Sequence, residues 1–105
     1  MDAQEQYYTQ RAELLKALAH PVRLRILREL CVNQINVTTL YTRLGLPQST
    51  ISRHLLVLKN AGIVFGHRHG LEIDYSIDCD QLEPFIKLII KDAADASSHL
   101  IEPKG

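Results

Sequence analysis

A chain of 105 residues, 46% hydrophobic and 23% charged, has the size of a single folded domain with one modest core. No stretch approaches the roughly 18 consecutive apolar residues of a membrane span, and the polar residues 1–6 are unlike a signal peptide, so we expect a cytoplasmic protein with no membrane partner. The formal net charge of zero excludes a uniformly basic chain, but it permits a local positive face if the acidic residues lie elsewhere.

Apolar residues at helical spacing predict two helices in the first third of the chain. The first covers about residues 5–18, and its apolar side includes Tyr7 and Leu14. The His20-Pro21 pair ends this helix, and Pro21 suits the first turn of a second helix that runs to about residue 32. The next four residues are expected to form a loop.

Two short helices joined by a tight turn are predicted over about residues 38–61. Thr38 is the expected N-cap of the first helix, and Gly45 can end it in the left-handed conformation. Pro47 opens the second helix, whose apolar residues recur at i, i+4 and i+7 from Ile51. Two helices in this arrangement are typical of a helix-turn-helix.

The spacing of the apolar residues then changes from helical to alternating. Over about residues 63–77, this alternation and the His69-Gly70 turn signal predict a β-hairpin. A hairpin directly after a helix-turn-helix makes the winged version of that motif. We therefore predict a mainly α fold with a small β-hairpin, a winged helix-turn-helix, in a single domain over residues 1–105.

A last helix is predicted over about residues 81–98. Asp80 and Glu83 have capping-box spacing at its start. Its apolar residues spread too widely around the helix for one small domain to cover them, so we expect the helix to take part in self-association.

Charge is segregated along the chain. No acidic residue lies between Glu29 and Glu72, and this stretch contains four basic residues: Arg43, Arg53, Lys59 and Arg68. Residues 72–105, in contrast, contain eight acidic and three basic residues. The central stretch can therefore form the positive face that a polyanion requires.

The second short helix carries side chains that suit a DNA groove. On the side opposite its apolar face lie Ser49, Arg53, Leu56 and Asn60, flanked by Gln48 and Ser52. Arginine can form paired hydrogen bonds with guanine, glutamine with adenine, and serine with a base edge or a phosphate. An ordinary solvated helix face would explain the same residues. Because the polar stripe, the acid-free stretch and the wing coincide, we favour binding to double-stranded DNA.

Three segments give the chain a specific resemblance. They are LAHPVRLRIL at residues 18–27, LGLPQSTISRHL at 44–55 and LKNAGIV at 58–64, and Arg68 and Gly70 continue the match through the hairpin. The pattern closely resembles the arsenic- and metal-responsive repressors of the ArsR/SmtB family over nearly the whole chain. The resemblance implies a homodimer, joined by its first and last helices, that binds an inverted repeat in DNA and blocks transcription.

The resemblance also implies which residues lie at each interface. DNA contacts are implied for Gln48, Ser49, Ser52, Arg53 and His54, with Arg68 of the wing at phosphate or the minor groove. We also expect DNA contacts from Thr50, His67 and His69, because for the two wing histidines a position facing phosphates is a simpler interpretation than metal chelation. The dimer interface is expected to contain Tyr7, Leu14, Leu82, Phe85, Ile86, Ile89 and Ile90. By helical spacing, His54 lies nearer the apolar side of its helix, so a hydrogen-bonded, half-buried histidine is an equal alternative to a DNA contact.

The metal sites typical of the family have no counterpart in this sequence. Its Cys-x-Cys pair falls on Asn36 and Thr38, which supply no thiolate. The ligands of its other common site fall on Cys79, Gln81, Asp92 and Asp95. Because this set includes no histidine, it is a poor match to zinc or cobalt, and we expect no metal site and no cofactor.

Two other functions stay open beside the DNA-binding repressor. One is a protein-interaction module on the same fold, which the acid-free stretch disfavours. The other is a thiol-responsive repressor that uses Cys31 and Cys79, although these cysteines lie 48 positions apart and unrelated reduced thiols are the simpler interpretation. We expect no catalytic residues, because no nucleophile-base set or phosphate-binding loop is present.

Overall fold

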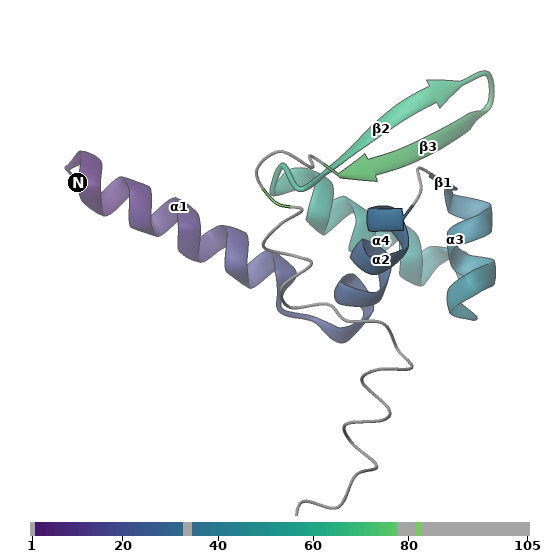
Figure 1. Ribbon diagram of the computed structural model, residues 1–105, viewed down its shortest axis with the longest axis horizontal. Helices are drawn as coiled ribbons and strands as arrows, with labels where there is room; N and C mark the ends of the chain where they lie inside the picture. The colour runs from purple at the N-terminus through teal and green to yellow at the C-terminus, as the bar shows by residue number, and fades with distance from the viewer. Residues whose placement is uncertain (1, 33–34, 78–81, 83–105) are drawn as a thin grey trace, which may run out of the picture.

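The computed structural model describes residues 2–32, 35–77 and 82, and over these residues a group of helices precedes a small sheet (Figure 1). The helices are α1 (Ala3–Leu18), α2 (Pro21–Val32), α3 (Val37–Leu44) and α4 (Gln48–Asn60). The strands are β1 (Ile35–Asn36), β2 (Val64–His69) and β3 (Glu72–Ile77). Helices α3 and α4 form the helix-turn-helix, and β2 and β3 form the wing, so the predicted fold class is confirmed.

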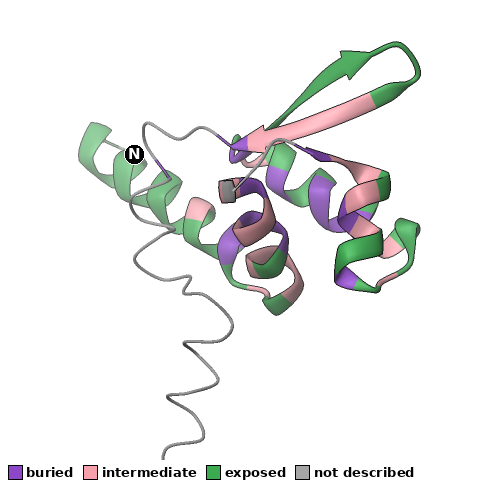
Figure 2. Ribbon diagram, turned by 45° about the vertical axis from the view of Figure 1, so that its right-hand side comes forward, coloured by how far each residue is buried: buried purple, intermediate pink, exposed green. Residues whose placement is uncertain are grey.

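Helix α1 begins earlier than the apolar spacing predicted. Asp2 is its N-cap, and the carboxylate accepts a hydrogen bond of 2.7 Å from the backbone N–H of Glu5. Only Ala17 and Leu18, at its C-terminal end, are buried. The rest of the helix projects from the body of the described chain, as Figures 1 and 2 show.

The strand β1 is absent from the sequence prediction, which placed a loop at residues 33–36. Ile35 pairs with Tyr75 and Asn36 with Asp74 in an antiparallel ladder, so the strand order is β1-β3-β2. Two residues are too few to show an alternating pattern. The consequence is that the wing is joined by hydrogen bonds to the segment that enters α3.

Asn36, and not the predicted Thr38, is the N-cap of α3. Its side-chain oxygen accepts a hydrogen bond of 2.8 Å from the backbone N–H of Thr39. Asn36 leaves β1 in an extended conformation, which is the backbone geometry that an N-cap needs. At the other end, Gly45 takes the predicted left-handed conformation, with φ 67°.

The core lies where α2 and the inner side of α4 meet the base of the sheet (Figure 2). Ile51, Leu55 and Leu58 of α4 are buried, which confirms the predicted apolar face of this helix. The largest fully buried side chains are Ile26, Leu27, Leu40, Ile51, Leu58, Ile63 and Val64. Because the inner face of α4 is held in this core, its opposite face is directed outward.

The capping role of Asn36 can be tested by comparison with Thr38. Asn36→Ala removes the side-chain bond to the first turn of α3, and we expect it to lower the free energy of unfolding by about 1 kcal/mol. Thr38→Ala is the matched control, because Thr38 is exposed inside the helix, and it should change stability by less than about 0.5 kcal/mol. Urea unfolding of both variants measures the difference, and equal losses would contradict this assignment.

Candidate nucleic-acid interface

The N-terminal half of α4 is open to solvent. Pro47 precedes the helix in an extended conformation and provides no side-chain cap hydrogen bond. The backbone N–H groups of Thr50 and Ile51 donate to the carbonyl oxygen of Pro47, and the two N–H groups before them, of Gln48 and Ser49, lie at the positive end of the helix dipole, which favours an anion such as phosphate.

The polar residues predicted to contact DNA lie on this open side. Gln48, Ser49, Ser52 and Arg53 are exposed, and Thr50 is half-buried. Leu56, on the same outward side, is also exposed. The helix therefore presents one arginine among short polar side chains, which is the composition that allows a helix to approach a groove closely.

His54 lies on the core side of α4, apart from these residues. Its side chain is only 8% exposed, and its ring centroid lies 4.3 Å from that of His20. The Nδ1 atom of His54 lies 3.2 Å from Nη1 of Arg23. A guanidinium can only donate hydrogen bonds, so Nδ1 of His54 is the acceptor and carries no proton in this contact.

The surroundings of His54 favour its neutral form. Burial lowers the pKa of His54, and the positive charges of His20, Arg23 and Arg53 lower it further. The His54 ring therefore acts as an uncharged hydrogen-bond acceptor. Of the two alternatives for His54 in the sequence, its position corresponds to the hydrogen-bonded histidine on the apolar side of the helix.

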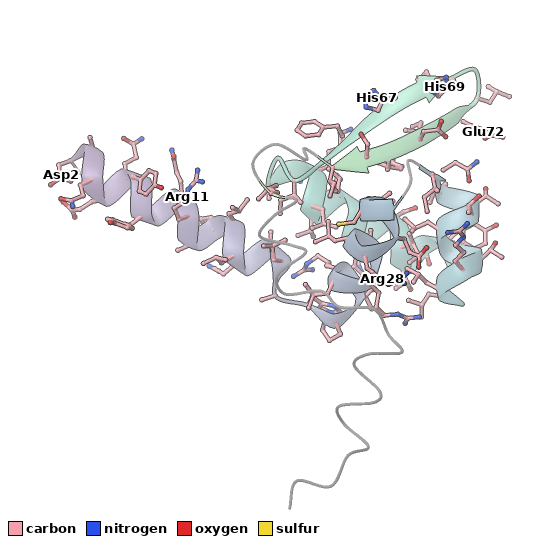
Figure 3. The ribbon with its side chains drawn as sticks, viewed as in Figure 1. Asp2, Arg11, Arg28, His67, His69 and Glu72 are labelled. Atoms are coloured by element: carbon pink, nitrogen blue, oxygen red, sulfur yellow. The ribbon has the colours of Figure 1, made fainter. Side chains whose placement is uncertain are left out.

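The wing has two different faces. Residues paired across the strands share a face, so Arg68 lies with Ile73, and His67 lies with Asp74 on the other side. On that second face, Nε2 of His69 is 3.3 Å from a carboxylate oxygen of Asp74, and Nε2 of His67 is 3.2 Å from the hydroxyl of Ser76. Figure 3 shows both histidines on the wing. All three predicted wing residues are exposed, but the histidines have a carboxylate beside them.

A cavity of about 370 Å³ separates the wing from the start of α4. It is lined by Asn36, Val37, Thr38, Gln48, Ser52, Leu71, Glu72, Ile73 and Tyr75. The side-chain amide of Asn36 donates a hydrogen bond of 3.0 Å to Glu72, so the residue that caps α3 also holds the start of β3. The bond joins the wing to the start of α3, and Ile73 and Tyr75, which share a face of the wing with Arg68, line the cavity.

Among the predicted dimer residues, Tyr7 is 54% exposed, Leu14 is half-buried against the core, and Leu82 is buried in it. Phe85, Ile86, Ile89 and Ile90 lie outside the described residues, as do Cys79, Gln81, Asp92 and Asp95. Cys31 is partly buried against the core. Within the described ranges, no group of three or more His, Cys, Asp and Glu residues could hold a metal ion, and no helix is long and apolar enough to cross a membrane.

A helix-turn-helix with an exposed polar helix and an adjoining wing defines the class of winged DNA-binding regulators. The model of the bacterial regulatory proteins of the arsR family matches residues 20–64. The transcriptional repressor PagR of Bacillus anthracis is 47% identical over 79 residues, which are 74% of this chain and 79% of PagR. The regulator NmtR of Mycobacterium tuberculosis is 38% identical over 89 residues, which are 85% of this chain and 71% of NmtR. The chain belongs to the ArsR family of regulatory proteins.

Solved structures agree with this assignment. The crystal structure of PagR has a TM-score of 0.74 at 42% identity and covers 82% of this chain and 99% of that one. The solution structure of a homodimeric winged helix-turn-helix DNA-binding domain from Mycobacterium bovis has a TM-score of 0.79 at 28% identity, covering 100% of this chain and 94% of that one. The chain is therefore a DNA-binding transcription regulator by family and by fold.

Stability should depend on the protonation of His54. The pKa of this histidine is lowered in the folded state from its ordinary value of 6.5, so the unfolded chain binds the proton more tightly. The stabilising contribution is complete above pH 6.5, and it is lost as the pH falls from 6.5 through the lowered folded-state pKa. Unfolding by urea at about pH 7.5 and about pH 5.5 should therefore show a larger loss of stability on acidification in the wild type than in His54→Gln. Equal losses in the two proteins would refute this role.

Proposed function

We propose that the chain is a transcriptional repressor that binds an inverted repeat in double-stranded DNA as a homodimer, with α4 as the recognition helix. The observation that carries the proposal is the exposed polar face of α4, with Arg53 at its centre, beside a wing whose Arg68 face carries no carboxylate directly opposite. A major groove admits a helix with such a face, and a wing beside it can reach the sugar-phosphate backbone.

The two wing faces differ in their suitability for phosphate. Asp74 lies directly opposite His67 and within 3.3 Å of His69, so its negative charge opposes a phosphate on that face. Arg68 lies opposite the apolar Ile73. We therefore infer that Arg68 makes the main backbone contact of the wing, and that His67 and His69 contribute less than the sequence suggested.

Dimerisation supports the choice of an inverted repeat. Tyr7, Tyr8 and Leu15 expose between 49% and 62% of their surface on α1, which is a large apolar area for one helix. The relative from Mycobacterium bovis is described as homodimeric. A twofold axis through an interface that includes α1 would place two recognition helices in successive major grooves, about one helical turn apart.

The proposed repressor is a cytoplasmic protein that performs no catalysis and uses no metal at the positions common in its family. Asn36, which replaces one family thiolate, is engaged in capping α3 and in binding Glu72. Its side chain therefore has a structural task that a metal ligand could not fulfil at the same time.

Selection of bound duplexes from a random pool, with and without a chelator, tests the function directly. We expect an inverted repeat whose half-sites lie about one helical turn apart, and the same sequence in both conditions. Enrichment of no sequence would refute the proposed function, and enrichment only without chelator would refute the absence of a metal.

Arg53 should read a base. Arg53→Ala should remove the preference at one base pair in each half-site, at about 1 to 3 kcal/mol per contact. Arg43→Ala is the matched control, because it removes the same charge from a residue of α3. Arg43 is paired with Glu29 of α2 at 3.0 Å. A repeat of the selection with each variant gives the result, and an unchanged motif with Arg53→Ala would assign base reading to another residue.

Arg68 should act on the backbone and not on the bases. Arg68→Ala should weaken binding to every duplex and reduce the slope of log affinity against log salt by about 0.9 per subunit. Titrations at several salt concentrations measure the slope. A loss confined to the operator sequence, with the slope intact, would identify Arg68 as a base reader.

A further inference from the structure

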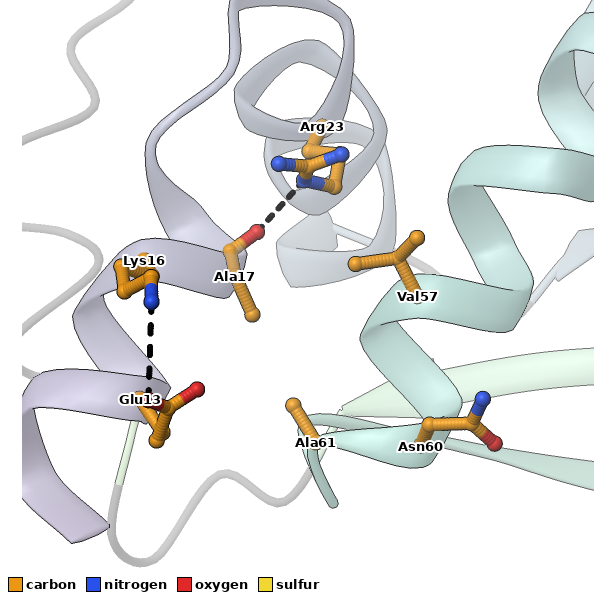
Figure 4. A pocket seen from close by; sticks show the side chains of 7 residues that line it. All are labelled: Glu13, Lys16, Ala17, Arg23, Val57, Asn60 and Ala61. Atoms are coloured by element: carbon orange, nitrogen blue, oxygen red, sulfur yellow. Dashed lines mark hydrogen bonds and ion pairs between the residues drawn. The ribbon is translucent and has the colours of Figure 1, made fainter.

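A cavity of about 430 Å³ lies where α1, α2 and α4 meet (Figure 4). It is lined by Glu13, Lys16, Ala17, Arg23, Val57, Asn60 and Ala61. The C-terminal halves of α1 and α4 therefore do not close against each other at this level of the described structure. At this level the two helices are held by the burial of Ala17 and Leu18 at the end of α1 and by polar contacts at the edge of the cavity.

Arg23 of α2 makes that contact at the edge of the cavity. Its Nε donates a hydrogen bond of 2.6 Å to the carbonyl oxygen of Ala17, and its Nη1 reaches Nδ1 of His54. Ala17 lies in the last turn of α1, where the carbonyl groups lack the usual helical partners and carry the negative end of the helix dipole. One guanidinium thus joins the end of α1 to the buried side of α4.

We propose that Arg23 is a positioning residue for DNA recognition, which holds the recognition helix at a set orientation to α1 through His54. The inference rests on the proposed function, because it takes α4 as the helix that reads DNA. Arg53 and His54 are consecutive residues of α4, about 100° apart around the helix, so a rotation that moves the His54 ring also displaces the exposed arginine. Arg23 itself is half-buried, and its hydrogen bonds go to Ala17 and to His54 on the inner side of α4.

The contact depends on the chemistry of both partners. The planar guanidinium directs two N–H groups to two acceptors at fixed angles, and the single ammonium of a lysine would not reproduce this geometry. His54 can accept only while Nδ1 is unprotonated. His20, Arg23 and Arg53 are the charged or titratable groups that face the ring, and the ion pair of Glu13 with Lys16 on α1, at 3.5 Å, lies across the cavity.

His20 supports the same junction. Its Nδ1 accepts a hydrogen bond of 3.0 Å from the backbone N–H of Val22, in the first turn of α2, while its ring lies against that of His54. The turn between α1 and α2 is therefore joined to α4 by a ring contact as well. A proton on His54 would be repelled by the guanidinium groups of Arg23 and Arg53 and would release the bond from Arg23.

The first test measures operator affinity and affinity for a random duplex, with the full chain and the operator obtained by selection. Arg23→Met should lower operator affinity about tenfold and leave random-duplex affinity and the salt slope unchanged. Arg28→Met is the control on the same helix, because the Arg28 guanidinium pairs with Glu29 at 3.2 Å, and it should change neither affinity by more than about twofold. A parallel loss on both duplexes in Arg23→Met would indicate a general defect in folding and would overturn the proposal.

The second test uses His54, so that the proposal does not depend on one variant. His54→Gln keeps an acceptor and should keep operator affinity, whereas His54→Leu should lower it as Arg23→Met does. The double variant Arg23→Met, His54→Leu should lose no more than either single variant, because both remove the same contact. Additive losses would show that the two residues act separately and would overturn the proposal.

A pH profile separates positioning from a purely structural role. Operator affinity of the wild type, relative to His54→Gln, should fall as the pH is lowered through the folded-state pKa of His54, which lies below its ordinary value, whereas relative random-duplex affinity should stay constant. A constant ratio for the operator would contradict the link. If the wild type itself selects no sequence, the proposed function fails and this inference falls with it; if it selects one and Arg23→Met binds it equally well, only the inference fails.

Discussion

The burial of one face of α4 is the constraint on which the rest of the structure depends. Ile51, Leu55 and Leu58 occupy the core beside α2 and the base of the sheet, so the helix cannot rotate without exposing apolar surface. Its polar residues are outward for that reason, and not because DNA is present. The wing and α1 are then joined to the body that carries this face. The wing is joined through the pairing of β1 with β3 and the bond from Asn36 to Glu72, and α1 is joined through the bond from Arg23 to Ala17.

The sequence predicts the helices, the hairpin and the two faces of α4 because these features rest on local periodicity. It does not predict β1, since two residues show no period, and it therefore assigns the cap of α3 to Thr38 and not to Asn36. The role of Arg23 is also invisible to local periodicity, because its partners are distant in sequence. A half-buried arginine on α2 is conspicuous only after folding brings Ala17 and His54, which are distant in sequence, to its two sides.

Charge along the sequence indicates a DNA-binding face more reliably than it identifies the residues that form it. Of the four basic residues in the acid-free stretch, Arg43 is paired with Glu29 at 3.0 Å, which lies just before that stretch. Asp74, which lies just after the stretch, returns to the wing beside His67 and His69. Acidic residues at the borders of the stretch thus neutralise part of its positive charge. Arg53 and Arg68 are therefore the residues that we most expect to contact the bases and phosphates of DNA.

Helix α1 connects two properties of the molecule that would otherwise be independent. Its exposed apolar residues suit contact with a second subunit, while its last carbonyls bind the arginine that orients α4. In the proposed dimer, α1 therefore lies between the second subunit and Arg23, the residue that joins the Ala17 carbonyl to His54 of α4. Because the core fixes the rotation of α4, this junction links the dimer contact to the orientation of the proposed recognition helix and gives that helix no freedom to turn.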